Sequence, residues 1–339
     1  MKLILLCSLI YAMTCTVALP EPARVSVHGN RFVTNNGTAI VFRGINSSDP
    51  DKLDRNGQLK TAYFAAIKSW GANIVRLPVH PSAWRIRGRD EYLKLLDRSI
   101  ALAREQGLYV IIDWHSIGNL QEEKFLQGSS ELYPPGLYNT TKAETLEFWR
   151  TMAARYGDNP TVAFFELFNE PADGGNLGKC SWEDWKQFME QVIAAIRENG
   201  CVTVPLVAGF NYGYDLKPVA TAPINAKGIG YVSHPYPMKR EKPWEAKWTQ
   251  DWGYLAEKYP LFLSEIGFCY PEDKNAHIPV ISDESYVEAI SAYCNPKGIS
   301  YAIWCFDPHW SPCLIEDWTF KPTRHGEYFR KAMLAQAAE

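Results

Sequence analysis

Short apolar segments alternate with longer amphipathic segments along most of the chain. Eight of the short segments are almost continuously hydrophobic, which is typical of parallel strands buried on both faces. They are Ala39–Ile45, Asn73–Val79, Leu108–Trp114, Val162–Phe168, Val202–Gly209, Gly228–His234, Leu261–Gly267 and Ile299–Cys305. The pattern therefore predicts eight buried, parallel strands.

Seven other segments carry hydrophobic residues at helical spacing between or after these strands. They are Thr61–Trp70, Asp90–Gln106, Lys142–Tyr156, Glu183–Asn199, Trp244–Tyr259, Asp283–Tyr293 and Arg324–Ala338. The first two stop at Gly71 and Gly107, and a glycine in this position is a common signal for the end of a helix.

Strands that alternate with helices in this way predict an α/β protein with a single (β/α)8 TIM barrel over residues 19–339. An open doubly wound sheet is the alternative, but no glycine-rich phosphate loop follows the first strand. Ahead of the barrel, Arg24–Val33 predicts a small N-terminal β-hairpin that turns at His28–Asn30 and closes the lower end of the barrel.

Residues 1–18 have the pattern of a signal peptide. Lys2 precedes the apolar run Leu3–Ile10, which is too short to span a bilayer, and cleavage is expected after Thr16–Ala18. A lipoprotein signal at Cys15 is the alternative, which Ala12–Thr14 fits poorly. We therefore expect a secreted, extracellular protein without a membrane-spanning segment.

Charge and aromatic content narrow the possible partners. The chain has 35 basic and 38 acidic residues and no basic run of the kind that binds nucleic acid. Its 12 tryptophans and 18 tyrosines suggest, besides core packing, a surface on which a ligand stacks. We expect a monomer with neither nucleic-acid nor membrane partners.

Six cysteines remain after the expected cleavage: Cys180, Cys201, Cys269, Cys294, Cys305 and Cys313. In an oxidising compartment they can form disulfides, and six cysteines allow 15 pairings. Proximity in the sequence favours Cys180–Cys201 and Cys305–Cys313. The spacing lacks the paired CxxC motifs of a zinc site.

Polar residues gather where the predicted strands end, the place where (β/α)8 barrels carry their catalytic groups. These residues are Arg76, His115, Asn169, Glu170, His234, Tyr236, Glu265 and Trp304. Glu170 and Glu265 follow the fourth and seventh strands. A pair of carboxyl groups in one cleft suits the cleavage of a glycosidic bond, since one group protonates the leaving oxygen and the other attacks the sugar or activates water.

The motifs around the two glutamates resemble glycoside hydrolase family 5. Leu167–Pro171 reads LFNEP, and Leu261–Gly267 reads LFLSEIG. Further support comes from Asn73–Pro78 (NIVRLP), Asp113–His115, His234–Tyr236 and Trp304, so that the resemblance extends from about Phe42 to Trp304. It implies a retaining hydrolase in which Glu170 is the general acid/base and Glu265 the nucleophile.

The resemblance also implies roles for the neighbours of the nucleophile. Arg76 and Tyr236 would lower the pKa of Glu265 and keep it ionised. Burial and the nearby negative charge would keep Glu170 protonated until the nucleophile has reacted.

Other residues would bind the sugar. Asn169 would bond the sugar 2-hydroxyl, and Trp304 would form the floor under the sugar at the cleavage point. His115 and His234 would position sugar hydroxyls or orient the glutamates.

Aromatic residues and long loops suggest how the rest of a cleft is built. Trp84, Tyr212 and Trp310 are candidate stacking platforms, with plain core packing as the alternative for each. The insertions Ser116–Thr141 and Phe306–Thr323 would form the cleft walls. Glu166 lies inside the fourth strand and is interpreted as a barrel layer residue. Lys239–Lys242 is interpreted as a solvated loop, with a place at the rim of the cleft as the alternative.

The leading functional hypothesis is a cellulase-type endo-β-1,4-glucanase that needs no cofactor and no metal. A β-mannanase or another β-glycan hydrolase of the same family is the alternative. The mannanase is the nearest of these, because mannose differs from glucose only in an axial 2-hydroxyl. An inactive carbohydrate-binding barrel is a second alternative. The presence of both glutamates argues against it, because inactive relatives usually lose one of them. Asp113 and His115 faintly resemble a metal-dependent hydrolase, but Phe42–Asn46 offers no His-x-His motif.

Overall fold

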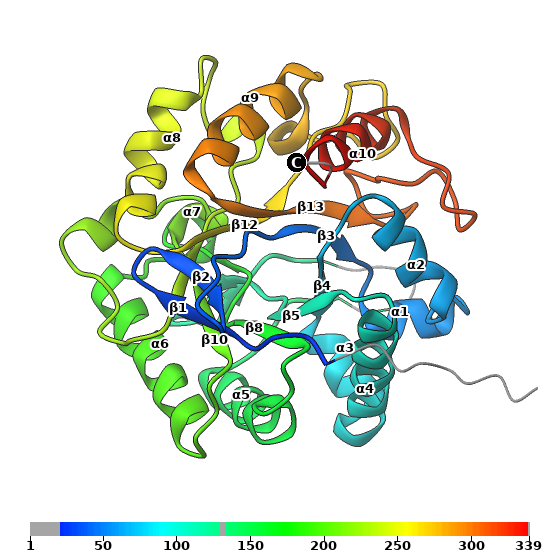
Figure 1. The fold of residues 1–339 in the computed structure, drawn as a ribbon. Coiled ribbons are helices and arrows are strands. Elements are labelled where there is room, and N and C mark those ends of the chain that lie inside the picture. The colour runs from blue at the N-terminus through cyan, green and yellow to red at the C-terminus, as the bar shows by residue number, and fades with distance from the viewer. Residues whose placement is uncertain (1–20, 129–132, 134, 338–339) are drawn as a thin grey trace, which may run out of the picture.

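A computed structural model describes residues 21–128, 133 and 135–337 of the 339-residue chain (Figure 1). The predicted signal peptide, residues 1–18, lies outside the described residues. None of the helices in the described ranges is both long and apolar enough to cross a bilayer.

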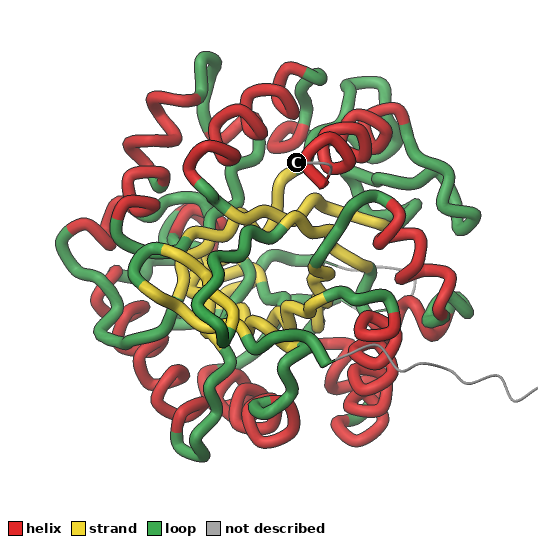
Figure 2. The backbone as a smooth tube through the Cα atoms, viewed as in Figure 1, coloured by secondary structure: helices red, strands yellow, loops and turns green. Residues whose placement is uncertain are grey.

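Eight parallel strands close into a barrel in the order β10, β11, β12, β13, β3, β4, β5, β8. Their bounds are β3 (Arg43–Ser47), β4 (Ile74–Val79), β5 (Tyr109–Trp114), β8 (Val162–Glu166), β10 (Val204–Ala208), β11 (Gly230–Val232), β12 (Leu261–Ile266) and β13 (Ser300–Phe306). Each predicted strand overlaps one of these, and the predicted TIM barrel is confirmed. Figure 2 shows the strands inside and the helices outside.

Aromatic side chains fill the N-terminal end of the barrel. The hairpin of β1 (Val25–His28) and β2 (Arg31–Thr34) covers this end, as predicted. Its Phe32 ring lies 4.7 Å from Phe164 and 6.1 Å from Phe42, centroid to centroid. Gly230 belongs to the same contact, because a Cβ there would lie 3.1 Å from the Phe32 ring.

The surrounding helices are α1 (Pro50–Arg55), α2 (Thr61–Ser69), α3 (Pro81–Arg87), α4 (Arg89–Glu105), α5 (Lys142–Tyr156), α6 (Trp182–Arg197), α7 (Phe210–Gly213), α8 (Glu245–Asp251), α9 (Ser285–Cys294) and α10 (Arg324–Ala337). The single helix predicted over Trp244–Tyr259 is wrong. It ends at Asp251, and a 3-10 segment, η4 (Gly253–Glu257), follows. The backbone leaves the helical conformation at Trp252, and the next residue, Gly253, lies against the Tyr293 hydroxyl, where no Cβ would fit.

The two expected disulfides are absent, since all six cysteines named above are free thiols. Cys180 and Cys201 stand at opposite ends of α6, whose 16 residues span about 24 Å, far beyond the reach of a disulfide. Cys305 and Cys313 lie on neighbouring segments, but the Cys305 thiol points to the carbonyl oxygen of Ser47, 3.5 Å away.

A small second sheet lies on the C-terminal face of the barrel. It consists of β6 (Ile117–Asn119), β7 (Lys124–Phe125) and β9 (Glu170–Pro171). β6 pairs with β9, and the amide of Glu170 donates to the carbonyl oxygen of Ser116 at 3.0 Å. The insertion that follows β5 therefore fixes the backbone at Glu170.

Candidate active site

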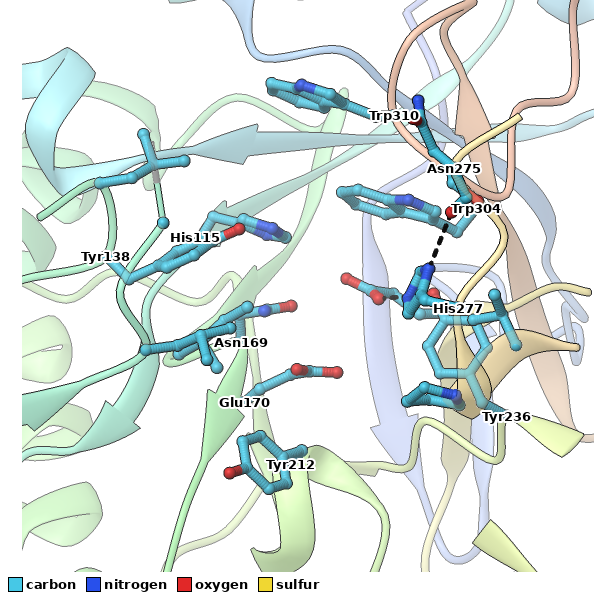
Figure 3. A pocket seen from close by; sticks show the side chains of 18 of the residues that line it. His115, Tyr138, Asn169, Glu170, Tyr212, Tyr236, Asn275, His277, Trp304 and Trp310 are labelled. Carbon is cyan, nitrogen blue, oxygen red and sulfur yellow. Dashed lines mark hydrogen bonds between the residues drawn. The ribbon is translucent and has the colours of Figure 1, made fainter. Parts of the chain in front are cut away.

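A cleft of about 720 Å³ opens at the C-terminal ends of the strands. Eight of the residues proposed from the sequence line it: His115, Asn169, Glu170, Tyr212, Tyr236, Glu265, Trp304 and Trp310 (Figure 3). Both predicted insertions contribute to its walls, through Leu126 and Tyr138 on one side and His309 and Ser311 on the other.

The two glutamates face each other across this cleft. Glu170 follows β8, and Glu265 lies on β12, two positions that the barrel brings together. One oxygen of each carboxyl group and Nδ1 of His234 all lie within 4.8 Å of one another. The Glu170 and Glu265 side chains are only 13% and 6% exposed, so both are largely shielded from water.

Arg76 on β4 is fully buried beneath the cleft and ties its floor together. Its Nη1 donates to Glu265 at 2.9 Å, while Nε and Nη2 donate to the two oxygens of Glu166 at 2.7 and 2.8 Å. Its other partners are Asn46, Asn169 and Asp113. Five N–H donors in a rigid fork suit this arrangement, which a lysine could not reproduce.

Glu166 lies in the barrel layer below the site, in agreement with its interpretation from the sequence. Besides Arg76 it accepts a hydrogen bond from the Ser264 hydroxyl at 2.8 Å. Burial works to raise the pKa of Glu166, but the charge of Arg76 and the nearby His234 lower it to about 2. Glu166 is therefore a fixed negative charge that holds two cationic side chains in place.

Glu265 has the two contacts that were predicted for it. Tyr236 Oη donates to Glu265 Oε2 at 2.9 Å, and Arg76 bonds the other oxygen. The predicted net lowering of its pKa is nevertheless wrong. Burial raises the pKa of Glu265 above its ordinary value, although His234 and Arg76 oppose this rise.

His234 lies between the glutamates rather than in the apolar core. Its Nδ1 is 3.0 Å from Glu170 Oε1, and its Nε2 is 2.9 Å from the Ser264 hydroxyl. Burial alone would lower the pKa of His234, but the surrounding carboxylates, Glu265 foremost, raise it to about 9. At neutral pH the ring is therefore an imidazolium ion beside the carboxyl pair.

His115 differs from His234 in charge. Its Nδ1 bonds Asp113 at 2.6 Å, and burial together with the nearby His80 lowers its pKa well below the ordinary value. The neutral ring stacks on Trp304, with centroids 5.2 Å apart and planes 6° from parallel. This contact holds the Trp304 ring in one orientation at the cleft floor.

The three candidate platforms divide into two groups. Trp310 lines the cleft with its ring parallel to that of Trp304, and Tyr212 lines the other end of the cleft in Figure 3. Trp84 does not line it. This ring is 8% exposed and packs edge-on against Phe148, which is the core-packing alternative.

Several cleft residues were not identified from the sequence. They are His80, Tyr138, Asn275, Pro279 and His277, together with Val280. Most lie in long loops, away from the strand ends that gave the signal. Lys239 also lines the cleft, which favours the rim alternative over a solvated loop for this residue. Burial lowers its pKa, although Glu170 and Glu265 oppose the effect.

The side chains of the site show whether a metal ion would find free ligands there. Within the described ranges, Glu170, His234 and Glu265 are the group whose ligand atoms converge closely enough to share a cation. Each of them already has a protein partner: Glu265 bonds Arg76 and Tyr236, and His234 bonds Glu170 and Ser264. Two cationic side chains thus already balance the carboxylates that a cation would need.

The chain is similar to known carbohydrate-active proteins. The family model "Cellulase (glycosyl hydrolase family 5)" matches residues 33–309. A β-glucanase of known structure from Saccharophagus degradans is 41% identical with a TM-score of 0.90, over 94% of this chain and 95% of that one. Endoglucanase A from Butyrivibrio fibrisolvens is 26% identical over 254 residues, which cover 72% of this chain but only 52% of that relative.

An endoglucanase from Paenibacillus polymyxa is 24% identical and is matched over 82% of its length by 86% of this chain. The family match covers well over half of the chain and includes both glutamates of the cleft. The chain therefore belongs to glycosyl hydrolase family 5, the cellulase family.

Proposed function

We propose that this protein is a retaining glycoside hydrolase that cleaves internal β-1,4 linkages of cellulose or β-glucan, with Glu170 as acid/base and Glu265 as nucleophile. The observation that carries the proposal is the separation of the two carboxyl groups, whose nearest oxygens lie within 4.8 Å. Retaining hydrolases hold their carboxyl groups about 5–5.5 Å apart, whereas inverting enzymes need about 6.5–9.5 Å to admit a water molecule.

In the first step, Glu265 attacks the anomeric carbon while the bond from that carbon to the leaving sugar breaks. Glu170 gives its proton to the departing oxygen, and a glycosyl ester forms on Glu265. Tyr236 and Arg76 hold the Glu265 carboxylate by its two oxygens, which fixes the direction of attack.

In the second step, Glu170 takes a proton from a water molecule that attacks the anomeric carbon. The ester bond breaks, the sugar leaves with its original configuration, and both glutamates return to their starting states. His234 Nδ1, 3.0 Å from Glu170 Oε1, holds the Glu170 carboxyl group in place for both steps.

Asn169 is suited to bind the sugar next to the bond that breaks. Its Oδ1 accepts from Arg76 at 2.7 Å, which orients the amide. Its Nδ2 is buried and lacks a partner among the described residues, although Asn169 lines the cleft. A buried donor without a partner is costly, so a sugar hydroxyl at this point would be bound favourably.

The substrate class follows from the cleft and from one relative. The similar β-glucanase from Saccharophagus degradans, 40% identical, has been solved in complex with cellotetraose. In this chain, aromatic rings at both ends of an open cleft would stack on successive sugars of such a chain (Figure 3). We therefore favour a β-glucan over mannan.

We also propose that the protein acts outside the cell. The support is the signal-peptide pattern of residues 1–18 and a relative from Xanthomonas campestris, the "Major extracellular endoglucanase", 27% identical over 293 residues. Detection of the mature protein in culture medium, with an N-terminus at residue 19, would test this point.

Initial rates on carboxymethyl cellulose, mixed-linkage β-glucan and mannan test the proposal, with Glu265→Gln as a matched inactive variant. Faster release of reducing ends from the glucans, lost in the variant, is expected. Faster release from mannan would make the protein a β-mannanase. Binding without release from any of the three would favour an inactive carbohydrate-binding barrel.

A further inference from the structure

The turn that follows β10 has a backbone conformation that side-chain-bearing residues rarely adopt. Asn211 has φ 54° and ψ 52°, and Tyr212 has φ 57° and ψ 56°, both in the left-handed region. For a bulky residue such as tyrosine this conformation is unfavourable, and it persists only where the surroundings impose it. The strained residue Tyr212 is also one that lines the cleft.

Contacts with the catalytic layer impose this turn. The carbonyl oxygen of Gly213 accepts a hydrogen bond from the amide of His234 at 3.0 Å. A Cβ on Gly213 would lie 3.0 Å from the His234 ring, so the chain passes directly over that ring. The turn is thereby held beside the histidine that contacts Glu170.

Lys239, in a second loop, also contacts the turn. It lies at the end of η3 (Pro237–Lys239), in the loop that follows β11. Its Nζ donates to the carbonyl oxygen of Asn211 at 2.8 Å and lies 5.0 Å from the centroid of the Tyr212 ring. One ammonium group thus contacts both the backbone and the ring of the strained pair.

The position of Tyr212 in the cleft indicates which part of the substrate its ring would contact. Tyr212 follows β10, which neighbours the strand that leads to Glu170, whereas Trp310 follows β13, beyond the strand of Glu265. Figure 3 shows Tyr212 and Trp310 at opposite ends of the cleft. If Glu170 is the acid, the leaving sugar lies on its side of the bond, which is the side of Tyr212.

We propose that Lys239 is a positioning residue that locks Tyr212 as the stacking platform for the leaving-group sugar. The inference rests on the proposed function, because it takes Glu170 as the acid. A cation over the face of a tyrosine ring is attractive, and a hydrogen bond to the Asn211 carbonyl stabilises the left-handed turn. Without the ammonium group, the ring would lose its fixed orientation and bind the sugar less well.

The experiment compares two substrates that differ on the leaving-group side only. Cellotetraose places sugars on that side, whereas β-cellobiosyl fluoride releases a fluoride ion and places none there. The variants are Lys239→Met, which keeps the length of the side chain, and Lys239→Arg, which keeps the charge. Lys242→Met is the matched control, because Lys242 lies in the same loop but bonds Asp283 and Ser285 away from the cleft.

For Lys239→Met we expect a roughly 5- to 20-fold loss of kcat/KM on cellotetraose, mainly through KM, and less than about a 2-fold change on the fluoride. Lys239→Arg should recover most of the loss, and Lys242→Met should change neither rate. Adding Lys239→Met to Tyr212→Ala should cause little further loss, since the lysine acts through that ring. Melting temperatures measured in parallel show that the variants are folded.

Equal losses on the two substrates, or additive losses in the double variant, would overturn the inference while leaving the proposed function intact. Should Lys239→Met fold poorly, Lys239→Gln permits the same comparison, because it removes the charge but leaves a polar side chain in the loop. A wild-type protein that cleaved neither substrate would instead overturn the proposed function and this inference with it.

Discussion

His234 Nδ1 lies 3.0 Å from Glu170 Oε1, so that a buried imidazole contacts the proposed acid/base directly. The carboxylates around this ring raise its pKa to about 9, which makes it a permanent cation at neutral pH. Together with Arg76 it balances the charges of Glu166 and Glu265, and this balance allows three glutamates to share one small region of the barrel.

The charge on His234 predicts a pH-dependent stability. The folded protein holds this proton more tightly than the unfolded chain, in which the pKa is near the ordinary value of 6.5. The contribution is therefore fully present below pH 6.5 and is lost as the pH rises through 9. This difference in pKa corresponds to roughly 3 kcal/mol of unfolding free energy.

Urea unfolding at about pH 6 and about pH 9.5 measures this effect. The wild type should lose free energy of unfolding over that interval, and His234→Gln should lose much less. His277→Gln is the control, because that histidine is exposed. Identical slopes in the wild type and His234→Gln would contradict the assignment.

Tyr236→Phe removes one hydrogen bond from the Glu265 carboxylate without changing the shape of the site. The pKa of Glu265 should rise further, because this bond favours the ionised form. As the nucleophile must be ionised, the acidic limb of kcat/KM should move up by about one pH unit, with an approximately tenfold loss at the optimum. A pH–rate profile that keeps its acidic limb would show that Glu265 does not control it.

Glu170→Ala should affect substrates according to their leaving group. Cellotetraose needs a proton on its departing oxygen, and its hydrolysis should fall by about a thousandfold. Formation of the glycosyl-enzyme from a dinitrophenyl β-cellobioside needs no proton, so the initial burst of dinitrophenol should persist within about tenfold. Stopped-flow absorbance gives the burst rate, and equal losses on both substrates would rule out Glu170 as the acid.

Phe32→Ala tests the hairpin that closes the barrel. The Phe32 ring contacts three other phenylalanine rings inside the barrel and is 3% exposed. Its removal should lower the free energy of unfolding by about 3–5 kcal/mol. At low temperature, where the variant stays folded, the enzyme should keep its activity, because the cleft lies at the other end of the barrel. Leu334→Ala is the control, because Leu334 on α10 is 38% exposed. It should cost well under about 1 kcal/mol of unfolding free energy in the same urea titration.

The sequence predicted the barrel and most of its catalytic floor for a physical reason. Parallel strands buried on both faces leave an unbroken apolar signal, and the first polar residues after each run must lie at one rim. Glu170 was found in this way, whereas Arg76 and Glu265 were noticed as charged residues inside the runs Asn73–Val79 and Leu261–Gly267. The resemblance to a known family then supplied roles that strand ends alone do not give.

Other features depend on contacts between distant loops, which no local pattern records. The sequence left open whether Lys239 lies in a solvated loop or at the cleft rim, because its hydrogen bond to the carbonyl oxygen of Asn211 joins two distant loops. Trp84 and Trp310 were both candidate platforms, yet only Trp310 reaches the cleft. The predicted lowering of the Glu265 pKa was wrong, because the effect of burial outweighs the two contacts that were correctly predicted.

The most direct test of the central claim is to trap the glycosyl-enzyme. Incubation with a dinitrophenyl 2-deoxy-2-fluoro-β-cellobioside, followed by peptide mass spectrometry, identifies the residue that carries the sugar. We predict inactivation with one fluorocellobiosyl group on Glu265, and no label on Glu265→Gln. A label on Glu170 or on any other side chain would contradict the double displacement through Glu265.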